Sequence, residues 1–175
     1  LRCEDAYRKY VYDKDLQITD TAAATLGRLL PPAEGRLKLS EIKERIYQCL
    51  EENLAYDESA VTLNGNNDFL AYTLEQKKKG YSVHYATATV LMLRYYGVPA
   101  RYVEGYYLRP EEANAAAPGE ELVLDETHAH AWAEYYLDGI GWIPFETTPG
   151  YIDQEEIGVS EDTGLGQDSY EEPDK

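Results

Sequence analysis

The pattern of hydrophobic and polar positions predicts helices in the first part of the chain. In residues 40–54, apolar side chains recur three and four positions apart, which is typical of an amphipathic helix with Ser40 as its N-cap. Residues 82–96 are apolar or small on nearly every face, which predicts a helix buried in the middle of the domain. The other N-terminal segments are predicted as helices at 19–30 and 69–79, the second ended by Gly80, and as extended chain or short turns at 7–18.

Alternating side chains predict strands in the second part of the chain. Residues 101–108 alternate as in a single strand, and residues 131–137 and 142–146 form a hairpin. Residues 110–127 form a long acidic connection of the kind that often makes a functional rim. Helices followed by strands indicate an α+β domain, in which the central buried helix packs on an antiparallel sheet behind a helical N-terminal lead-in.

The register of the hairpin decides whether His130 and Glu146 can meet. A three-residue loop with Gly141 in the left-handed conformation pairs Leu137 with Gly141. His130 then lies opposite Thr148, and Glu146 is its diagonal neighbour on the same face, about 7–8 Å away between backbones. A glutamate side chain spans that gap, whereas a two-residue loop would place the two residues on opposite faces.

Ser82, His130 and Glu146 are therefore the candidate catalytic residues. Ser82 begins the buried helix, where unpaired backbone N–H groups and the helix dipole favour negative charge. A carboxylate that orients an imidazole, and an imidazole that faces a nucleophile, form the general layout of a catalytic triad. Taken singly, the three residues are more simply a helix cap, a structural histidine and a surface charge.

Composition and charge narrow the classes of protein. A chain of 175 residues with 43% hydrophobic residues is globular and of single-domain length, and no apolar run is long enough to span a bilayer. The formal net charge of -17 disfavours binding to nucleic acid or to anionic lipid. Cys3 and Cys49 allow at most one disulfide. Because the chain starts at Leu1, we expect a piece of a longer protein.

The charge is concentrated near the C-terminus. Nine acids and one lysine give the stretch 151–175 a net charge of -8, with little apolar content. We therefore predict a folded domain at residues 1–151 and an acidic flexible tail or linker at 152–175.

Three motifs in this order resemble the core of the transglutaminase-like superfamily. They are GYSVHYATA at 80–88 with MLRYYGVPARYVEGY at 92–106, HAWAEY at 130–135, and GWIPFETTP at 141–149. The resemblance covers about residues 56–149, and residues 7–54 resemble the helical lead-in of bacterial members. It implies a papain-like α+β fold with a Cys-His-Asp triad that performs acyl transfer through a thioester, either amine transfer to glutamine side chains or peptide or amide hydrolysis.

By position, the resemblance implies that Ser82 stands in the place of the cysteine, His130 in that of the histidine and Glu146 in that of the aspartate. It implies no metal and no other cofactor. It also implies a protein or peptide substrate, no membrane contact by this piece, and an extracytoplasmic domain of a membrane-anchored or secreted bacterial protein. We expect the substrate cleft to be lined by Tyr81, Tyr106, Tyr107 and Trp132.

Two residues depart from the family pattern. Glu146 keeps the charge of the aspartate and adds one methylene of reach. Ser82 is the severe change, because a thiol with a pKa near 8.5 can be brought to thiolate at neutral pH, whereas an alkoxide lies many pH units further away. The domain is therefore expected to be inactive as written, through engineering of position 82 or through natural loss of the chemistry.

Two alternatives belong to other classes of protein. The first is a pseudoenzyme that binds a peptide or glycan in the same cleft without catalysis. The second is a metal hydrolase that uses His128 and His130, two positions apart on extended chain, with Asp125 and Glu126 nearby. His84 is expected to be structural.

Overall fold

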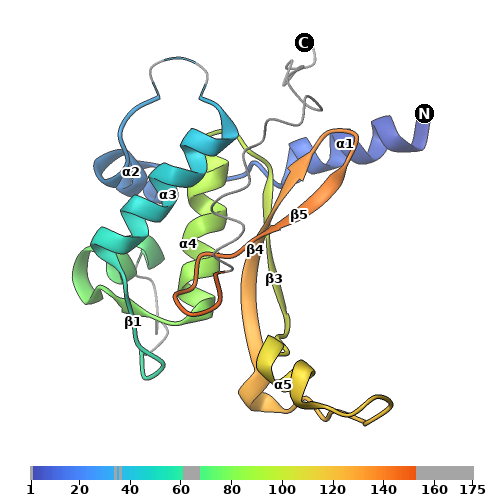
Figure 1. The fold of residues 1–175 in the computed structure, drawn as a ribbon. Helices are drawn as coiled ribbons and strands as arrows, with labels where there is room; N and C mark the ends of the chain where they lie inside the picture. Colours follow the sequence, from blue (N-terminus) through green and yellow to red (C-terminus); the bar gives the residue numbers. More distant parts are fainter. Residues whose placement is uncertain (1, 34, 36, 61–67, 153–175) are drawn as a thin grey trace.

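The computed structural model describes residues 2–33, 35, 37–60 and 68–152, and it shows a mixed fold of helices around a three-stranded antiparallel sheet (Figure 1). The predicted acidic tail at 152–175 lies outside the described residues, apart from Ile152. The elements run α1 (Arg2–Lys14), α2 (Asp20–Leu29), α3 (Leu39–Asn53), β1 (Ala55–Tyr56), η1 (Ala71–Lys77), β2 (Lys79–Gly80), α4 (Ser82–Tyr95), β3 (Ala100–Tyr106), α5 (Pro110–Ala115), η2 (Glu126–His128), β4 (Ala129–Leu137) and β5 (Gly141–Phe145).

Helix α4 is the centre of the hydrophobic core. Its side chains are buried on several faces, and it lies against α2, α3, β3 and β4. The fully buried neighbours include Leu26 of α2, Ile46 of α3 and Leu70 before η1. The predicted central buried helix on an antiparallel sheet is confirmed, and Gly97 follows it in the left-handed region with φ +80°.

The sheet has the order β3-β4-β5, and its hairpin has the predicted register. Leu137 pairs with Gly141 and Ala133 with Phe145, and Gly141 has φ +114°. Strands β3 and β4 continue past the end of β5 as a two-stranded ribbon, in which Gly105 pairs with His130. This ribbon and α5 form an arm that projects from the helical body (Figure 1).

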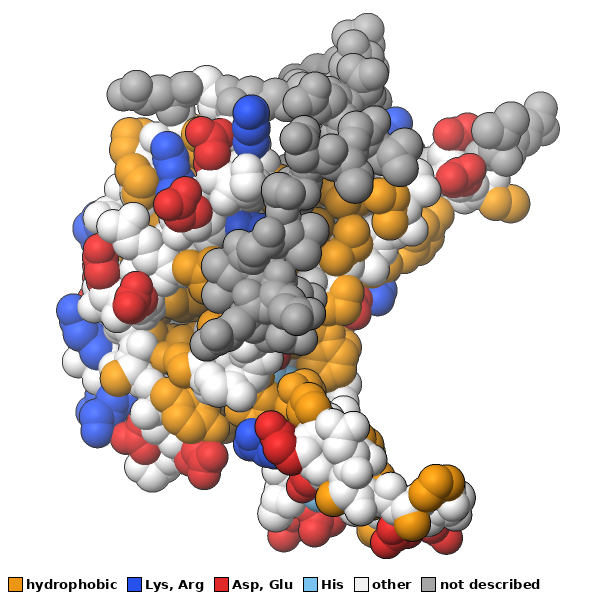
Figure 2. Space-filling model, in the orientation of Figure 1, with side chains coloured by type: hydrophobic (Ala, Val, Ile, Leu, Met, Phe, Trp, Pro, Cys, Tyr) orange, Lys and Arg blue, Asp and Glu red, His pale blue; other side chains and the backbone are white. Residues whose placement is uncertain are grey.

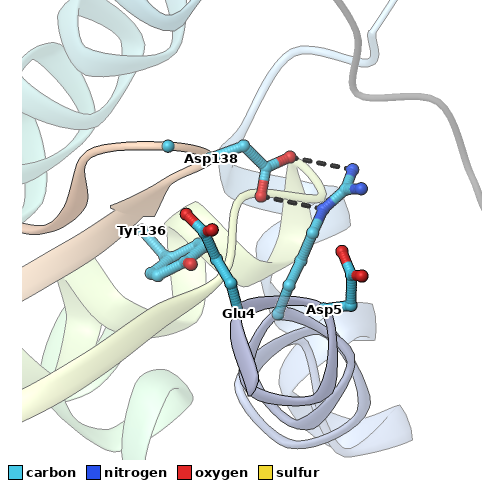
Figure 3. A pocket seen from close by; sticks show the side chains of 6 residues that line it. Glu4, Asp5, Tyr136 and Asp138 are labelled. Atoms are coloured by element: carbon cyan, nitrogen blue, oxygen red, sulfur yellow. Dashed lines mark hydrogen bonds and ion pairs between the residues drawn. The ribbon is translucent and has the colours of Figure 1, made fainter. Parts of the chain in front are cut away.

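The prediction of extended chain or short turns at 7–18 was wrong, because residues up to Lys14 belong to helix α1. Its amphipathic pattern is weak, and its place is set by contacts with the hairpin turn: the Arg8 guanidinium and Asp138 form an ion pair of 2.9 Å, and the Tyr12 hydroxyl donates to the same carboxylate. Val11 is completely buried. Figure 3 shows the pair at the wall of a pocket of about 200 Å³, where Glu4, Asp5 and Tyr136 also lie.

The predicted start of the helix at 40–54 was wrong. Helix α3 begins at Leu39 rather than after Ser40, because the Glu41 carboxylate accepts from the Lys38 N–H (2.8 Å) and fixes the first turn there. The predicted connection at 110–127 contains the short helix α5 and the turn η2. No helix of the described residues is both long and apolar enough to cross a membrane.

The predicted helix at 69–79 is instead the π-helical segment η1, followed by Lys78 with φ +54° and by strand β2. Strand β2 pairs with β1 in parallel, with Tyr56 opposite Gly80. Gly80 does not end a helix. Its missing side chain makes room for His84, since a Cβ on Gly80 would lie 2.6 Å from the Cβ of His84.

Replacement of Gly80 by alanine is expected to destabilise the domain by about 1–3 kcal/mol, because His84 must move out of a packed site. Gly27→Ala is the matched control: its Cβ would meet only the Tyr95 hydroxyl at 3.5 Å, and alanine favours the helix by about 0.5–1 kcal/mol. Thermal unfolding followed by circular dichroism measures both. A Gly80→Ala chain as stable as the original would contradict the close packing.

Candidate active site

The imidazole of His130 and the carboxylate of Glu146 are joined directly. His130 lies on β4, Glu146 follows the last residue of β5, and the His130 Nε2–H donates to Glu146 Oε2 at 2.5 Å. The two side chains are 2% and 16% exposed. The predicted contact is confirmed, and it has a chemical consequence. Because Nε2 carries the donated proton, Nδ1 is the nitrogen of the neutral ring that can accept one.

The backbone that follows β5 holds Glu146 in place. Its second carboxylate oxygen, Oε1, accepts from the N–H groups of Thr147 (2.8 Å) and Thr148 (2.7 Å). Its carbonyl oxygen accepts from the hydroxyl of Tyr47 on α3 (2.8 Å). Thr147 is in turn linked to Thr89 of α4 by a buried hydroxyl pair of 2.8 Å. Both oxygens of the carboxylate are therefore engaged, and the segment is fixed to α3 and α4.

Ser82 is buried at the first position of α4, with an exposure of 8%. The first turn of a helix leaves backbone N–H groups without partners inside the helix, and these groups favour developing negative charge. Tyr81 occupies the N-cap position and packs edge-on against His84. Within the described part of the chain, no hydrogen bond joins Ser82 to His130, so the structure joins two of the three candidate residues.

Strand β1 lies beside the chain that leads into α4. Tyr56 pairs with Gly80, two positions before Ser82. Burial and the hydrogen bond to Glu58 raise the pKa of the Tyr56 hydroxyl to about 12.

Aromatic rings surround the imidazole of His130. The ring of Tyr151 is stacked on it at a centroid distance of 4.0 Å, Tyr107 lies at 5.8 Å, and Trp132 is nearly parallel to it at 6.3 Å. Trp132 lies over Gly105, where a Cβ would come within 2.8 Å of the indole.

Of the residues predicted to line the cleft, some lie beside His130 and others do not. Tyr107 and Trp132 contact His130. Tyr106 is 60% exposed and, by strand alternation, lies on the face of β3 opposite to the Gly105–His130 pair. Figure 2 shows hydrophobic side chains gathered over the lower part of the body in this view, beside the arm. A role of these residues in binding substrate stays a prediction.

The sequence did not identify Tyr151 and Arg109 as part of this region. Arg109 donates from Nη2 to the Tyr151 hydroxyl (3.1 Å), and its guanidinium also lies over the ring at 4.9 Å. Tyr151 follows the turn residues Pro149 and Gly150 and begins an acidic stretch, so its position alone indicated the edge of a tail. Its aromatic character was the one available signal.

The other histidines have separate surroundings. His84 is buried, its Nδ1 accepts from the Tyr81 N–H (3.3 Å), and burial lowers its pKa. His128 contacts Asp125 (3.0 Å) and Glu112 (3.4 Å) instead of sharing ligands with His130. No group of three or more His, Cys, Asp or Glu within the described ranges could hold a metal ion.

Both cysteines are free thiols, and they differ in burial. Cys3 is exposed on α1, whereas Cys49 is buried on α3. Burial raises the pKa of the Cys49 thiol to about 11, against a smaller opposing effect of the hydrogen bond from Asn53. At neutral pH, Cys49 is therefore a structural side chain, and Cys3 is the accessible native thiol.

The fold and the His130–Glu146 pair agree with a match to a known family. The family model of the transglutaminase-like superfamily matches residues 32–147. The match spans more than half of the chain, and the chain belongs to this superfamily.

Several bacterial proteins are similar to this chain. The chain is 31% identical over 114 residues to the uncharacterized protein YebA of Bacillus subtilis, and 38% identical over 89 residues to a protein-glutamine gamma-glutamyltransferase of Pseudomonas aeruginosa. These matches cover 65% and 51% of this chain but 16% and 12% of the relatives, so the matched region spans less than a fifth of their length. Its structure is similar to the periplasmic domain of TgpA from Pseudomonas aeruginosa, with a TM-score of 0.60, 25% identity, and coverage of 79% of this chain and 47% of that one.

Proposed function

We propose that this chain is the acyl-transfer domain of a transglutaminase-like protein and that serine at position 82 leaves it with little or no activity as it stands. Ser82 occupies the nucleophile position, His130 is the general base, and Glu146 orients and stabilises the imidazole. The observation that carries the proposal is the hydrogen bond between His130 Nε2 and Glu146 Oε2. It turns a basic nitrogen, Nδ1, away from the carboxylate and leaves it available to a nucleophile.

With a thiol at position 82, the chemistry follows from these groups. The thiol gives its proton to His130 Nδ1, and the charge of Glu146 stabilises the imidazolium that forms. The thiolate attacks the carbonyl carbon of an amide, and the backbone N–H groups at the start of α4 face the developing oxyanion. The imidazolium then protonates the leaving nitrogen, which departs as ammonia or an amine. A second amine or water gives a proton to His130 and releases the acyl group from sulfur.

Serine changes the first of these steps. Because a hydroxyl is far less acidic than a thiol, the helix terminus and the imidazole cannot hold it as a stable anion. His130 would have to remove the proton as the C–O bond forms, which requires the hydroxyl to lie within hydrogen-bond reach of Nδ1. No such hydrogen bond of Ser82 is present among the described residues. The low acidity of the hydroxyl is the reason for proposing that the domain has the base and its orienting carboxylate but a weak nucleophile.

The relatives support a choice of substrate and location. One is a protein-glutamine gamma-glutamyltransferase, and the solved structure is a periplasmic domain. We therefore propose that the acyl donor is a glutamine side chain of a protein or peptide, and that the domain works outside the cytoplasmic membrane. This chain matches only part of each relative. The acyl donor and the location are therefore proposals for this chain, made from its similarity to those larger proteins.

A non-catalytic binding module is the second candidate. The observation that favours it is the combination of Ser82 with an aromatic surface around His130, since rings with polar edges suit peptide or glycan binding.

Incorporation of a fluorescent primary amine into a glutamine-rich protein, measured by gel fluorescence and mass spectrometry, tests the proposed function. The original chain is expected to give no signal above background, and Ser82→Cys is expected to transfer the amine. Ser82→Ala is the matched control, since it removes the nucleophile with almost no change in volume. If Ser82→Cys binds the substrate but neither incorporates amine nor releases ammonia, the binding module is the better account.

A further inference from the structure

Tyr151 covers one face of the imidazole of His130. The ring planes differ by 14°, and the centroids are 4.0 Å apart, which is the closest aromatic contact of His130 among the described residues. The residue comes from the segment that follows Glu146, and the backbone turns back there: the Tyr151 N–H donates to the carbonyl of Thr148 (3.1 Å), and Gly150 has φ +85°. The same segment therefore holds the His130 ring at one nitrogen and on one face.

The arm holds Tyr151 in this position from the other side. The ring of Tyr107 meets Tyr151 edge-on at 5.1 Å. Arg109 both donates to the Tyr151 hydroxyl and lies over its ring. Tyr107 and Arg109 belong to the chain between β3 and α5, so two segments distant in the sequence converge on Tyr151.

The contacts with Tyr151 restrict a rotation of the His130 imidazole that the single hydrogen bond to Glu146 would still allow. The bond from Nε2 to Glu146 fixes one point of the imidazole and the Cβ of His130 fixes another, and the ring can still turn about the line that joins these two points. That rotation changes the direction in which Nδ1 points. A parallel ring in contact with one face blocks the rotation, because the imidazole would have to tilt into the tyrosine ring.

We infer that Tyr151 is a positioning residue for His130: its ring fixes the plane of the imidazole so that Nδ1 is directed at position 82, and Arg109 acts through Tyr151. The inference rests on the proposed function for its catalytic meaning, whereas the stacking itself is a property of the fold. Phenylalanine keeps the ring but loses the hydroxyl, and leucine keeps apolar bulk but loses the ring. These two replacements separate the ring, the hydroxyl and simple filling of space.

Proton NMR of the imidazole groups tests the stacking without any use of activity. The chain has three histidines, so His84→Gln and His128→Gln are sufficient to assign the His130 signals. A ring 4.0 Å above the imidazole moves its carbon-bound protons upfield. The upfield shift is expected to persist in Tyr151→Phe and to be strongly reduced in Tyr151→Leu, which leaves only the more distant rings of Tyr107 and Trp132. His130 signals that are the same in the original and in Tyr151→Leu would overturn the inference.

Alkylation by iodoacetamide at pH 6.5 tests the positioning in the Ser82→Cys background. Tyr151→Leu is expected to lower the rate at position 82 by about 10- to 100-fold, as for other small misplacements of a catalytic group, with little change for Tyr151→Phe and an intermediate loss for Arg109→Gln. An increased rate in Tyr151→Leu would overturn the inference and identify Tyr151 as a cover over the site. If the thiol of Ser82→Cys with native Tyr151 reacts no faster than an ordinary thiol, the proposed function fails. The NMR experiment still shows whether the Tyr151 ring stacks on His130.

Discussion

A thiol introduced at position 82 by Ser82→Cys is expected to react with iodoacetamide at pH 6.0 at least about 30-fold faster than Cys3. An ordinary thiol with a pKa near 8.5 is about 0.3% thiolate at this pH. A thiol at a helix N-terminus that shares its proton with an imidazole is largely thiolate, and its lower intrinsic nucleophilicity offsets only part of that gain. The expected ratio therefore measures how far the surroundings of position 82 favour negative charge.

The chain provides its own reference for this measurement. Cys3 is exposed in the first turn of α1, so it serves as a helix-terminal thiol outside the candidate site, and Cys49 does not compete because it is buried with a raised pKa. Limiting reagent followed by peptide mass spectrometry gives the ratio of labelling at positions 82 and 3 within one sample. Cys3→Ala in the same background shows whether labelling of Cys3 alters the result. Because Cys3 also lies in the first turn of a helix, equal labelling of the two positions would mean that the His130–Glu146 pair does not activate a nucleophile at position 82.

Removal of Glu146 is expected to produce the second large effect. In the Ser82→Cys background, Glu146→Gln is expected to reduce the rate of amine incorporation by up to about 10⁴-fold, the loss known when the orienting carboxylate of a Ser-His-Asp triad becomes an amide. The amide keeps the shape of the side chain but removes the charge that stabilises the imidazolium. Glu146→Asp keeps the charge and loses one methylene of reach, so it is expected to retain much more activity than Glu146→Gln.

Stability measurements separate this catalytic effect from structural damage. Glu146→Ala leaves the N–H groups of Thr147 and Thr148 without their acceptor, which is expected to cost about 1–3 kcal/mol for each group that stays buried. Glu146→Gln can still accept these bonds through its amide oxygen and is expected to unfold at nearly the original temperature. If Glu146→Gln lost activity only in proportion to a loss of folded protein, Glu146 would be a structural residue.

The parts of the fold that local rules determine were predictable from the sequence. The turn at Gly141 set the register of the hairpin, and that register brought His130 and Glu146 to one face, where the structure joins them. The buried helix α4 was also predicted within one residue, because its apolar character and Gly97 both act locally. The pairing of His130 with Glu146 is thus a consequence of turn geometry and of the two-residue period of a strand.

The parts that depend on distant contacts were not predictable in this way. Helix α1 has a weak pattern, and its contacts with Asp138 lie more than a hundred positions away in the sequence. Tyr151 was missed for the same reason: its contacts with His130 and Arg109 exist only once the arm and the segment after β5 have come together. Gly80 was read as a helix terminator, although its role is to leave space for His84.

The central claim is that the His130–Glu146 pair activates position 82, and the pH dependence of alkylation tests it most directly. Ser82→Cys and Ser82→Cys with His130→Ala are compared from pH 5 to pH 9, both in the Cys3→Ala background. We predict that Ser82→Cys reacts almost equally fast from pH 8.5 down to about pH 6, and that the variant without His130 slows about tenfold for each pH unit below 8.5. Two parallel profiles with the steep dependence of an ordinary thiol would contradict the claim.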